Sequence, residues 1–264
     1  PSAVDITTPV FGQPELLEQM LDSLLAHEAG IEWNLFLVDD IGPKREEVDA
    51  VYKKFQDKDS RIHVLRNTHN LGFAGSNNRG FRAGSAPLLL MLNSDVEVCD
   101  EGWLYAMAME FKDEQVGVVG AKLLFFEAYE HPTAAHFPGK VQHAGVAFNL
   151  LGQPYHVLQG WGPENPKVSR RKEFNAVTGA CMLTRRDLYF ELGGLDEDYK
   201  TGNFEDVQYC LQVRKLGYKV IYQSAARLYH YAGGSGNSAT ARFNEGLFRI
   251  KCKDLIEYDE FKHW

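Results

Sequence analysis

The sequence predicts an α/β fold in which helices cover both faces of a mostly parallel sheet. Two observations carry this prediction. Strand-like apolar segments alternate with segments of helical periodicity along the first hundred residues. The 264 residues, 44% of them hydrophobic, are also enough to bury one sizeable core without disulfides or a structural metal. We therefore expect one large α/β unit.

The first hundred residues are expected to form strands and helices in strict alternation. The expected strands cover Ala3 to Phe11, Leu35 to Val38, Ile62 to Leu65 and Leu88 to Leu92. The expected helices cover Pro14 to Leu25, Lys44 to Phe55 and Ala74 to Ala83. Repeated units of this kind form parallel sheets, and ligands collect at the carboxyl ends of their strands. The polar segments Thr8-Pro9, Asp39-Asp40 and Asn93-Ser94-Asp95 should therefore meet at one edge.

The rest of the chain is less regular. Further strands are expected at Val116 to Phe126, Ala180 to Thr184 and Lys219 to Tyr222. Further helices are expected at Trp103 to Phe111, Arg186 to Leu192, Glu205 to Leu216 and Ala239 to about Ile256. Between them, Glu127 to Phe174 is rich in Pro, Gly, His and aromatic residues, with a hairpin-like piece at Val141 to Phe148. Long irregular insertions of this kind are usually functional.

Composition excludes several classes of protein. The net charge of -8 argues against a nucleic-acid partner, which would need an excess of Lys and Arg. The longest aliphatic stretch, Leu88 to Leu92, is too short for a transmembrane segment. The four cysteines show no metal-ligand spacing, and no secretory signal precedes the first strand. We expect a cytoplasmic protein, with the cytosolic face of a membrane as an alternative place, and the start at Pro1 suggests a longer chain.

The segment from Asn67 to Asp95 combines glycines with amide side chains. A helix that begins near Ala74 would favour a diphosphate oxygen at its N-terminus. The pattern matches neither a P-loop nor a dinucleotide fingerprint, and an ordinary Gly-rich turn remains an alternative. Asp95 follows a strand and could bind Mg²⁺ or Mn²⁺, although a turn or helix cap would use the same residue type.

These motifs resemble those of a known family. The segment N-L-G-F-A-G-S-N-N-R-G, followed by an apolar strand and N-S-D, resembles family 2 glycosyltransferases with a GT-A fold. The resemblance is to the branch that builds O-antigens and other surface polysaccharides, which includes rhamnosyltransferase-like proteins. Downstream segments agree in the same order: V-Q-H-A-G-V, A-V-T-G-A-C, G-G-L-D, E-D-V-Q-Y-C, L-G-Y-K-V-I-Y and L-Y-H-Y. The match runs from Ile6 to about Gly236.

The resemblance implies a single GT-A domain over residues 1–264, with a Rossmann-like, mostly parallel sheet and a smaller subsheet on the acceptor side. Residues 1–95 would form the nucleotide-sugar-binding half and residues 96–236 the acceptor-binding half. Residues 237–264 would form a helical tail, and the chain would be part of a longer protein.

The resemblance also implies a site and a reaction. The residues expected to bind the nucleotide-sugar are Thr8, Pro9, Phe11, Asp39, Asp40, Asn70, Gly72, Asn77, Asn78, Asn93, Ser94 and Asp95. The metal, Mn²⁺ or Mg²⁺, would be held by Asp95 and His230, and Asn93 stands where the family usually has its first Asp. The residues expected around the sugar and acceptor are His143, Trp161, Gly179 and Glu205. Asp206 would be the general base of an inverting transfer.

The implied donor is a UDP- or dTDP-sugar, and the implied acceptor is a glycan, a lipid-linked glycan or a protein. Alternatives remain for single residues: Glu205 and Asp206 could simply complement a helix dipole, and His230 could be structural. Two other functions remain as alternatives. A sugar nucleotidyltransferase would need a Gly-rich loop with Arg and Lys where T-T-P-V-F-G stands, and a non-catalytic nucleotide- or glycan-binding module would explain Asn93.

Overall fold

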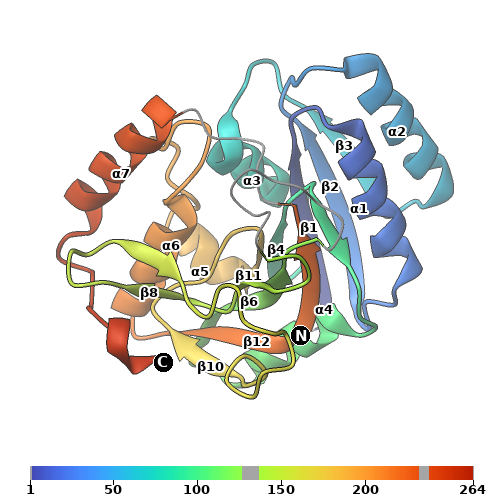
Figure 1. Cartoon of the computed structure of the whole chain (residues 1–264). Coiled ribbons are helices and arrows are strands. Elements are labelled where there is room, and N and C mark those ends of the chain that lie inside the picture. The colour runs from blue at the N-terminus through green and yellow to red at the C-terminus, as the bar shows by residue number, and fades with distance from the viewer. Residues whose placement is uncertain (1, 127–136, 232–237, 264) are drawn as a thin grey trace.

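The structure, a computed structural model, describes residues 2–126, 137–231 and 238–263. Its main sheet has the strand order β10-β12-β6-β11-β4-β1-β2-β3, with β5 added to β12 and β7 added to β6. A second, two-stranded antiparallel sheet is formed by β8 and β9. Figure 1 shows the N-terminal strands on one side of the molecule and the later elements on the other. The expected fold class, an α/β sheet with a smaller subsheet, is confirmed.

The N-terminal part is a run of parallel strands joined by helices. The strands are β1 (Ala3–Val10), β2 (Glu32–Asp39), β3 (Ile62–Arg66) and β4 (Leu88–Leu92), and the helices are α1 (Pro14–Ala26), α2 (Arg45–Lys58) and α3 (Gly72–Ala83). The register pairs Val10 with Asp39 and Asp39 with Arg66, so the strands end side by side. The polar residues that follow them therefore share one edge, as a parallel sheet requires.

The second part mixes strand directions. Its strands in the main sheet are β5 (Val96–Val98), β6 (Val116–Leu124), β7 (Val141–His143), β10 (Lys172–Phe174), β11 (Cys181–Arg185) and β12 (Lys219–His230). Strand β11 runs antiparallel to both β4 and β6, and β12 runs parallel to β6. The helical elements are α4 (Trp103–Met109), η1 (Glu110–Lys112), α5 (Arg186–Glu191), α6 (Glu205–Lys215), α7 (Ser238–Cys252) and η2 (Glu260–Lys262).

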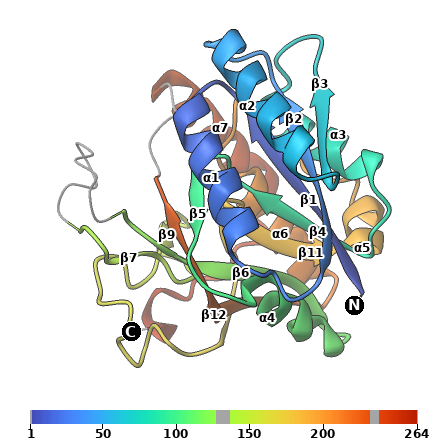
Figure 2. The same cartoon turned by 90° about the vertical axis from the view of Figure 1, so that its right-hand side faces the viewer.

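Two apolar clusters cover the two faces of the main sheet. One cluster joins the sheet to α1, α2 and α4, with the fully buried Trp103 among its largest side chains. The other joins the sheet to α3, α5, α6 and α7 through residues such as Phe81, Tyr189 and Phe248. Figure 2 shows α1 and α2 on the face of the sheet away from α6 and α7. No helix in the described ranges is long and apolar enough to cross a bilayer.

Two expectations about local structure are wrong. The piece from Val141 to Phe148 is not a hairpin, because β7 pairs with β6 whereas β8 (Val146–Phe148) pairs with β9 (Pro154–His156). The chain passes from the main sheet to the two-stranded sheet at Gly145, whose φ is 111°. A Cβ at this position would collide with the Phe174 ring. The strand expected at Lys219 to Tyr222 extends to His230, because the chain resumes its pairing with β6 after an irregularity between Gln223 and Arg227.

Candidate functional site

A cavity of about 710 Å³ opens where β4, β12 and the start of α6 come together. Strand β9 and the loops 178–180 and 201–204 complete its walls. The cavity brings together six residues expected at the site: Asn93, Asp95, Gly179, Glu205, Asp206 and His230. It therefore joins the expected metal-binding residues to the expected base.

Asp206 is held in place by backbone amides. Its Oδ2 accepts a hydrogen bond from the N–H of Gly179 at 2.7 Å, and its Oδ1 accepts one from the N–H of Val207 at 2.8 Å. Burial raises the pKa of Asp206, whereas these backbone hydrogen bonds act in the opposite direction. A carboxylate with a raised pKa is a stronger base than an ordinary aspartate.

Glu205 differs sharply from its neighbour in its surroundings. Its side chain is buried, and its Oε2 has no hydrogen-bond partner within the described part of the chain. Burial, reinforced by the charge of Asp206, raises the pKa of Glu205 to about 8. At neutral pH Glu205 is therefore mostly protonated, and it lies beside the Asp206 carboxyl group that accepts two backbone N–H groups. The wall of the cavity thus offers one donor and one acceptor side by side.

Gly179 is required at its position by close packing. A Cβ built on it would lie 3.1 Å from the Cβ of Asp206 and 3.2 Å from the ring of Phe73. A side chain would have to displace one of them. The sequence analysis placed Gly179 near the sugar, and the structure shows that its backbone N–H also positions Asp206.

Asn93, Asp95 and His230 form a polar group at the other wall of the cavity. His230 Nε2 lies 3.3 Å from Asp95 Oδ1 and 3.2 Å from Asn93 Nδ2. Burial by itself would raise the pKa of Asp95, but His230 and local hydrogen bonds more than offset this and leave the pKa lowered. Ser94, which lies between Asn93 and Asp95 in the sequence, is half-buried.

Gln142 determines which nitrogen of His230 faces Asp95. Its amide nitrogen donates to the carbonyl oxygen of His230 at 3.0 Å, so its Oε1, at 2.7 Å from His230 Nδ1, must be the acceptor. His230 Nδ1 therefore carries the proton, and in the neutral ring Nε2 presents a lone pair to Asp95. The Asn93 amide nitrogen, 3.2 Å from Nε2, is a donor to this lone pair, and Asp95 Oδ1 lies 3.3 Å away, so Nε2 and the carboxylate face the same point of the cavity wall.

This group fits a divalent cation. A carboxylate is a ligand that Mg²⁺ and Mn²⁺ accept, and a neutral imidazole is compatible with Mn²⁺. Asn93 presents its amide nitrogen to His230 and so adds no oxygen ligand in this arrangement. Among the described residues no three His, Cys, Asp or Glu side chains gather into a metal site. A cation between Asp95 and His230 would therefore have to take further oxygen ligands from a bound molecule, as a diphosphate can supply.

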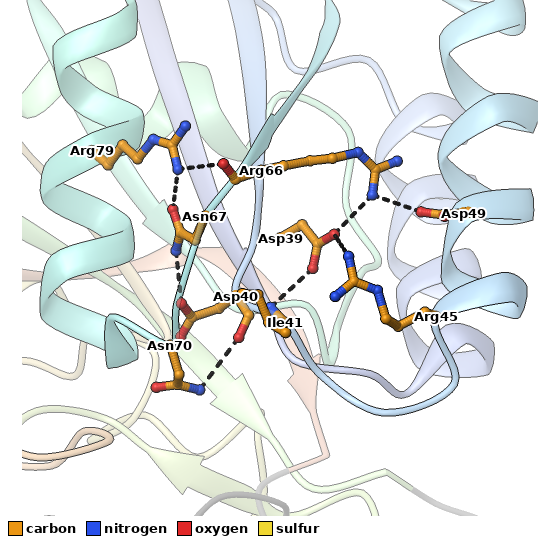
Figure 3. A network of polar contacts seen from close by, with 9 residues as sticks. All are labelled: Asp39, Asp40, Ile41, Arg45, Asp49, Arg66, Asn67, Asn70 and Arg79. Atoms are coloured by element: carbon orange, nitrogen blue, oxygen red, sulfur yellow. Dashed lines mark hydrogen bonds and ion pairs between the residues drawn. The ribbon is translucent and has the colours of Figure 1, made fainter.

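Asp40, which is expected to bind nucleotide, organises the start of α3. Its Oδ1 accepts hydrogen bonds from the N–H of Leu71 and from the amide of Asn67, both at 2.7 Å. Its Oδ2 accepts one from the N–H of Gly72 at 2.9 Å, where φ is 69°. Asn70 donates to the carbonyl oxygen of Asp40 at 3.3 Å (Figure 3). These bonds satisfy amides that a helix N-terminus leaves unpaired.

Asp39 lies beside Asp40 in a cationic setting. Its Oδ2 lies 2.9 Å from Arg66 and 4.0 Å from Arg45, and its Oδ1 accepts the N–H of Ile41 at 3.1 Å (Figure 3). Arg66 also pairs with Asp49. The expected contact of Asp39 with a base would therefore take place next to two guanidinium groups.

The remaining expected nucleotide contacts lie outside the cavity walls. Asn78 donates to Leu195 O and Glu197 and accepts from Tyr189, which ties α3 to the loop after α5. Asn77 donates to the carbonyl oxygen of Phe73 within α3. Thr8 is fully buried with an unpartnered hydroxyl, Pro9 is half-buried, and Phe11 is exposed at the surface.

Two expected acceptor residues also lie outside the cavity wall. His143 is fully buried behind it, and its Nδ1 lies 2.8 Å from the Nδ1 of His156, which does line the cavity. Burial lowers the pKa of His143 well below its usual value. Trp161 packs on the apolar cluster around Val141 and carries Lys167 over its ring.

Sequence reasoning missed several residues of the site. Gln142 lies in the V-Q-H-A-G-V segment, but its partner His230 is 88 positions away, so no spacing rule could connect them. The loop 201–204 and Ala241 of α7 also line the cavity. The T-G-N-F segment directly before Glu205-Asp206 was a signal for the loop, whereas Ala241 gave none.

The fold and the cavity define the class of protein. The parallel strands β1 to β4, with Asp95 after β4 facing the acidic pair at the start of α6, agree with the GT-A fold that the sequence resemblance implies. The family model described as "Glycosyl transferase family 2" matches residues 5–192. The chain belongs to that family and is a glycosyltransferase domain.

Individual relatives agree with this assignment. The chain is 32% identical over 239 residues to the O-antigen biosynthesis protein RfbC of Myxococcus xanthus, covering 88% of this chain and 17% of RfbC. It is 28% identical over 236 residues to the uncharacterized protein y4gI of Sinorhizobium fredii, covering 88% of this chain and 25% of y4gI. The chain thus spans a quarter or less of these two relatives. The family predicted from the motifs is confirmed, and RfbC is a relative from the O-antigen branch that the motifs resemble.

Solved structures agree on the fold. GalNAc-T7, crystallised with UDP, GalNAc and Mn²⁺, superposes with a TM-score of 0.72 at 17% identity, over 99% of this chain and 49% of that one. The mannosyltransferase PcManGT of Pyrobaculum calidifontis, in complex with GDP-Man and Mn²⁺, gives 0.62 at 14% identity, over 94% and 60%. At these identities the likeness shows the shared fold.

Proposed function

We propose that this chain transfers a sugar from a nucleoside-diphosphate sugar to a hydroxyl group of a glycan or lipid-linked glycan, with inversion at the anomeric carbon. The observation that carries the proposal is the position of Asp206, which is held by two backbone N–H groups in the same cavity as Asp95 and His230. The likeness to RfbC supports a role in surface-polysaccharide synthesis.

In the proposed reaction Asp206 is the general base. The acceptor oxygen attacks the anomeric carbon of the donor, and the bond from that carbon to the diphosphate breaks on the opposite side. The acceptor's proton passes to a carboxylate oxygen of Asp206, and the electron pair of the broken bond leaves with the nucleoside diphosphate. Attack opposite the leaving group inverts the anomeric centre. A base near the acceptor oxygen accelerates such a step by about 10²- to 10⁴-fold.

Asp95 and His230 are the proposed holders of a divalent cation, Mn²⁺ or Mg²⁺. When bound, the cation would neutralise charge on the leaving diphosphate. The structure of GalNAc-T7 contains UDP and Mn²⁺ and that of PcManGT contains GDP-Man and Mn²⁺, which supports this proposal.

The same proposal assigns donor binding and acceptor binding to different parts of the chain. Residues 1–95 would bind the nucleotide of a UDP- or dTDP-sugar, near the carboxyl ends of β1 and β2. Residues 96–236 would bind the acceptor, with Gly179 and Glu205 beside the sugar. The larger size of the relatives leaves room for further domains in the whole protein.

A donor screen tests the proposal. We expect one UDP- or dTDP-sugar to raise the melting temperature in the presence of Mn²⁺ and to release nucleoside diphosphate slowly. Asp206→Asn should keep the thermal shift and lose transfer to an acceptor. Asp187→Asn is the matched control, because Asp187 also accepts the next residue's N–H at a helix start, at 2.8 Å, yet lies outside the cavity. Full transfer by Asp206→Asn would overturn the assignment of the base.

A binding module without catalysis is the second candidate. Asn93 favours it, because an amide replaces a carboxylate in the candidate cation site and lowers the negative charge available there. Thermal shifts by nucleotide-sugars together with no release of nucleotide from any donor would favour this candidate over the enzyme.

A further inference from the structure

We propose that Asn244 of helix α7 is a positioning residue that holds the loop 200–204 in the conformation needed for transfer. This inference rests on the proposed function, because the loop forms one wall of the cavity that contains Asp206. Asn244 lies outside residues 5–192, the part of the chain that the family model matches.

Asn244 forms hydrogen bonds to the loop through both the oxygen and the nitrogen of its side-chain amide. It is completely buried. Its Oδ1 accepts the N–H of Lys200 at 3.1 Å, and its Nδ2 donates to the carbonyl oxygens of Lys200 at 2.9 Å and Gly202 at 2.6 Å. Only a side chain with both an acceptor and two donors can make these three bonds. An asparagine at this point of α7 is therefore chemically specific.

The loop that Asn244 holds has an unfavourable backbone. Four consecutive residues have positive φ angles: Thr201 at 55°, Gly202 at 127°, Asn203 at 88° and Phe204 at 80°. Three of them carry side chains, for which this region is disfavoured. Such a conformation persists only where the surrounding structure imposes it. The hydrogen bonds of Asn244 to the backbone of Lys200 and Gly202 stabilise this conformation of the loop.

Helix α7 supports the same loop through packing. The ring of Phe204 stacks on the ring of Phe248, one turn along α7 from Asn244, with centroids 5.2 Å apart. Ala241, one turn in the other direction, lines the cavity itself. Figure 1 shows α7 beside the end of the molecule that carries α6. Helix α7 therefore contacts the loop at two successive turns, through Asn244 and Phe248, and reaches the cavity at the turn before them.

The position of the loop 200–204 determines the position of Glu205 and Asp206. Phe204 is followed directly by Glu205 and Asp206. A Cβ on Gly202 would lie 3.3 Å from Phe73 and 3.5 Å from Glu205 Oε1, so the loop fits closely between them. A shift of this wall by about 1 Å would misplace the base relative to the acceptor, and misplacements of that size can lower rates by about 10²-fold.

The experiment compares Asn244→Ala with Asn175→Ala. Asn175 is also buried, and its Nδ2 donates to a C-terminal carbonyl, that of Glu257, at 3.0 Å, but it does not contact the loop. We expect both variants to lose thermal stability. Asn244→Ala alone should lower kcat by about tenfold or more, with the donor KM and the thermal shift by UDP and Mn²⁺ changed less than about threefold, because its partners lie away from the nucleotide-binding half.

Hydrogen exchange supplies a second readout that does not need turnover. The amides of residues 200–206 should exchange faster in Asn244→Ala than in wild type or Asn175→Ala. Asn244→Asp, which keeps the acceptor but not the donors, should show the same direction and serves if the alanine variant does not fold.

Two results overturn the inference: a kcat for Asn244→Ala within twofold of Asn175→Ala, or unchanged exchange of the loop. A wild-type protein that releases no nucleotide from any donor would instead overturn the proposed function, and the exchange measurement would still decide whether Asn244 holds the loop.

Discussion

The start of α3 and the start of α6 are both rich in polar residues, and they differ in how those residues are used. At α3 each oxygen of Asp40 is occupied by protein donors, and Asn78 bonds to three residues of another segment. At α6 a carboxyl oxygen of Glu205 has no partner among the residues described, and the preceding loop holds a disfavoured backbone.

The difference separates polar groups that maintain the fold from polar groups that await a ligand. Satisfied groups such as those of Asp40 contribute to stability, and their removal exposes backbone amides of α3. Unsatisfied buried groups destabilise the free protein and are tolerated where a substrate can pair with them. Mutations in the two regions should therefore have opposite effects on stability and activity.

The largest effect should come from Asp206→Asn. Loss of the base should lower kcat by about 10²- to 10⁴-fold, while the melting temperature changes little. The measurement is transfer to acceptor, set beside thermal unfolding. A large loss of stability with kcat preserved would place Asp206 with the fold-maintaining group and remove the contrast with Asp40.

Glu205→Gln should stabilise the protein at alkaline pH. Because the folded protein raises the pKa of Glu205 to about 8, the folded state keeps a proton that the unfolded state has already released. Wild-type stability should therefore fall as pH rises from about 5 to about 8, by about 1.4 kcal/mol per pH unit. The stability of Glu205→Gln should not fall over this pH range for this reason, because glutamine has no proton to release.

Urea denaturation across that pH range measures the effect of Glu205. The stability difference between Glu205→Gln and wild type should be small at pH 5 and grow toward pH 8. Glu114→Gln, which removes an exposed carboxyl group, controls for the change of net charge. A pH-independent difference would contradict the burial of a neutral Glu205.

Asp40→Ala should destabilise the fold. It removes the acceptor for the N–H groups of Leu71 and Gly72 and for Asn67, and the loss of such a helix-start acceptor costs about 1–2 kcal/mol. Chemical denaturation measures the free energy of unfolding, and kcat at saturating donor measures catalysis. A collapse of donor binding with unchanged stability would show that Asp40 serves the nucleotide instead.

Gln142→Ala should weaken cation dependence. Gln142 fixes the ring of His230 from behind, and loss of such a partner typically lowers metal affinity by about 10- to 100-fold. Titration of Mn²⁺ against the thermal shift by UDP measures the affinity. Gln153→Ala is the control, because it removes another side-chain amide, one that accepts from Asn149 and donates to Glu245. Equal Mn²⁺ dependence in Gln142→Ala and wild type would remove Gln142 from the site.

The sequence predicts the fold well because each parallel strand is a short apolar segment between clear helix signals, as at Leu88 to Leu92. It predicts the residue types of the site through motifs, but not their tasks. Asp40 and Asp206 look alike in sequence, and only the direction of the amides around each one distinguishes them. The roles of Asn244 and Gln142 could not be predicted from the sequence, because their hydrogen-bond partners lie 42–44 and 88 positions away. The hairpin prediction failed because Gly145 redirects the chain between two sheets.

The length of β12 has a consequence for the order in which the protein is built. This strand pairs with β6, β10 and β5 and brings His230, close to its end, to Asp95, which follows β4. The parallel strands β1 to β4 are complete once residue 92 has been synthesised, whereas this pairing must close a loop of more than a hundred residues. Such distant contacts form late and slowly. A nascent chain can therefore assemble its parallel sheet well before His230 reaches Asp95.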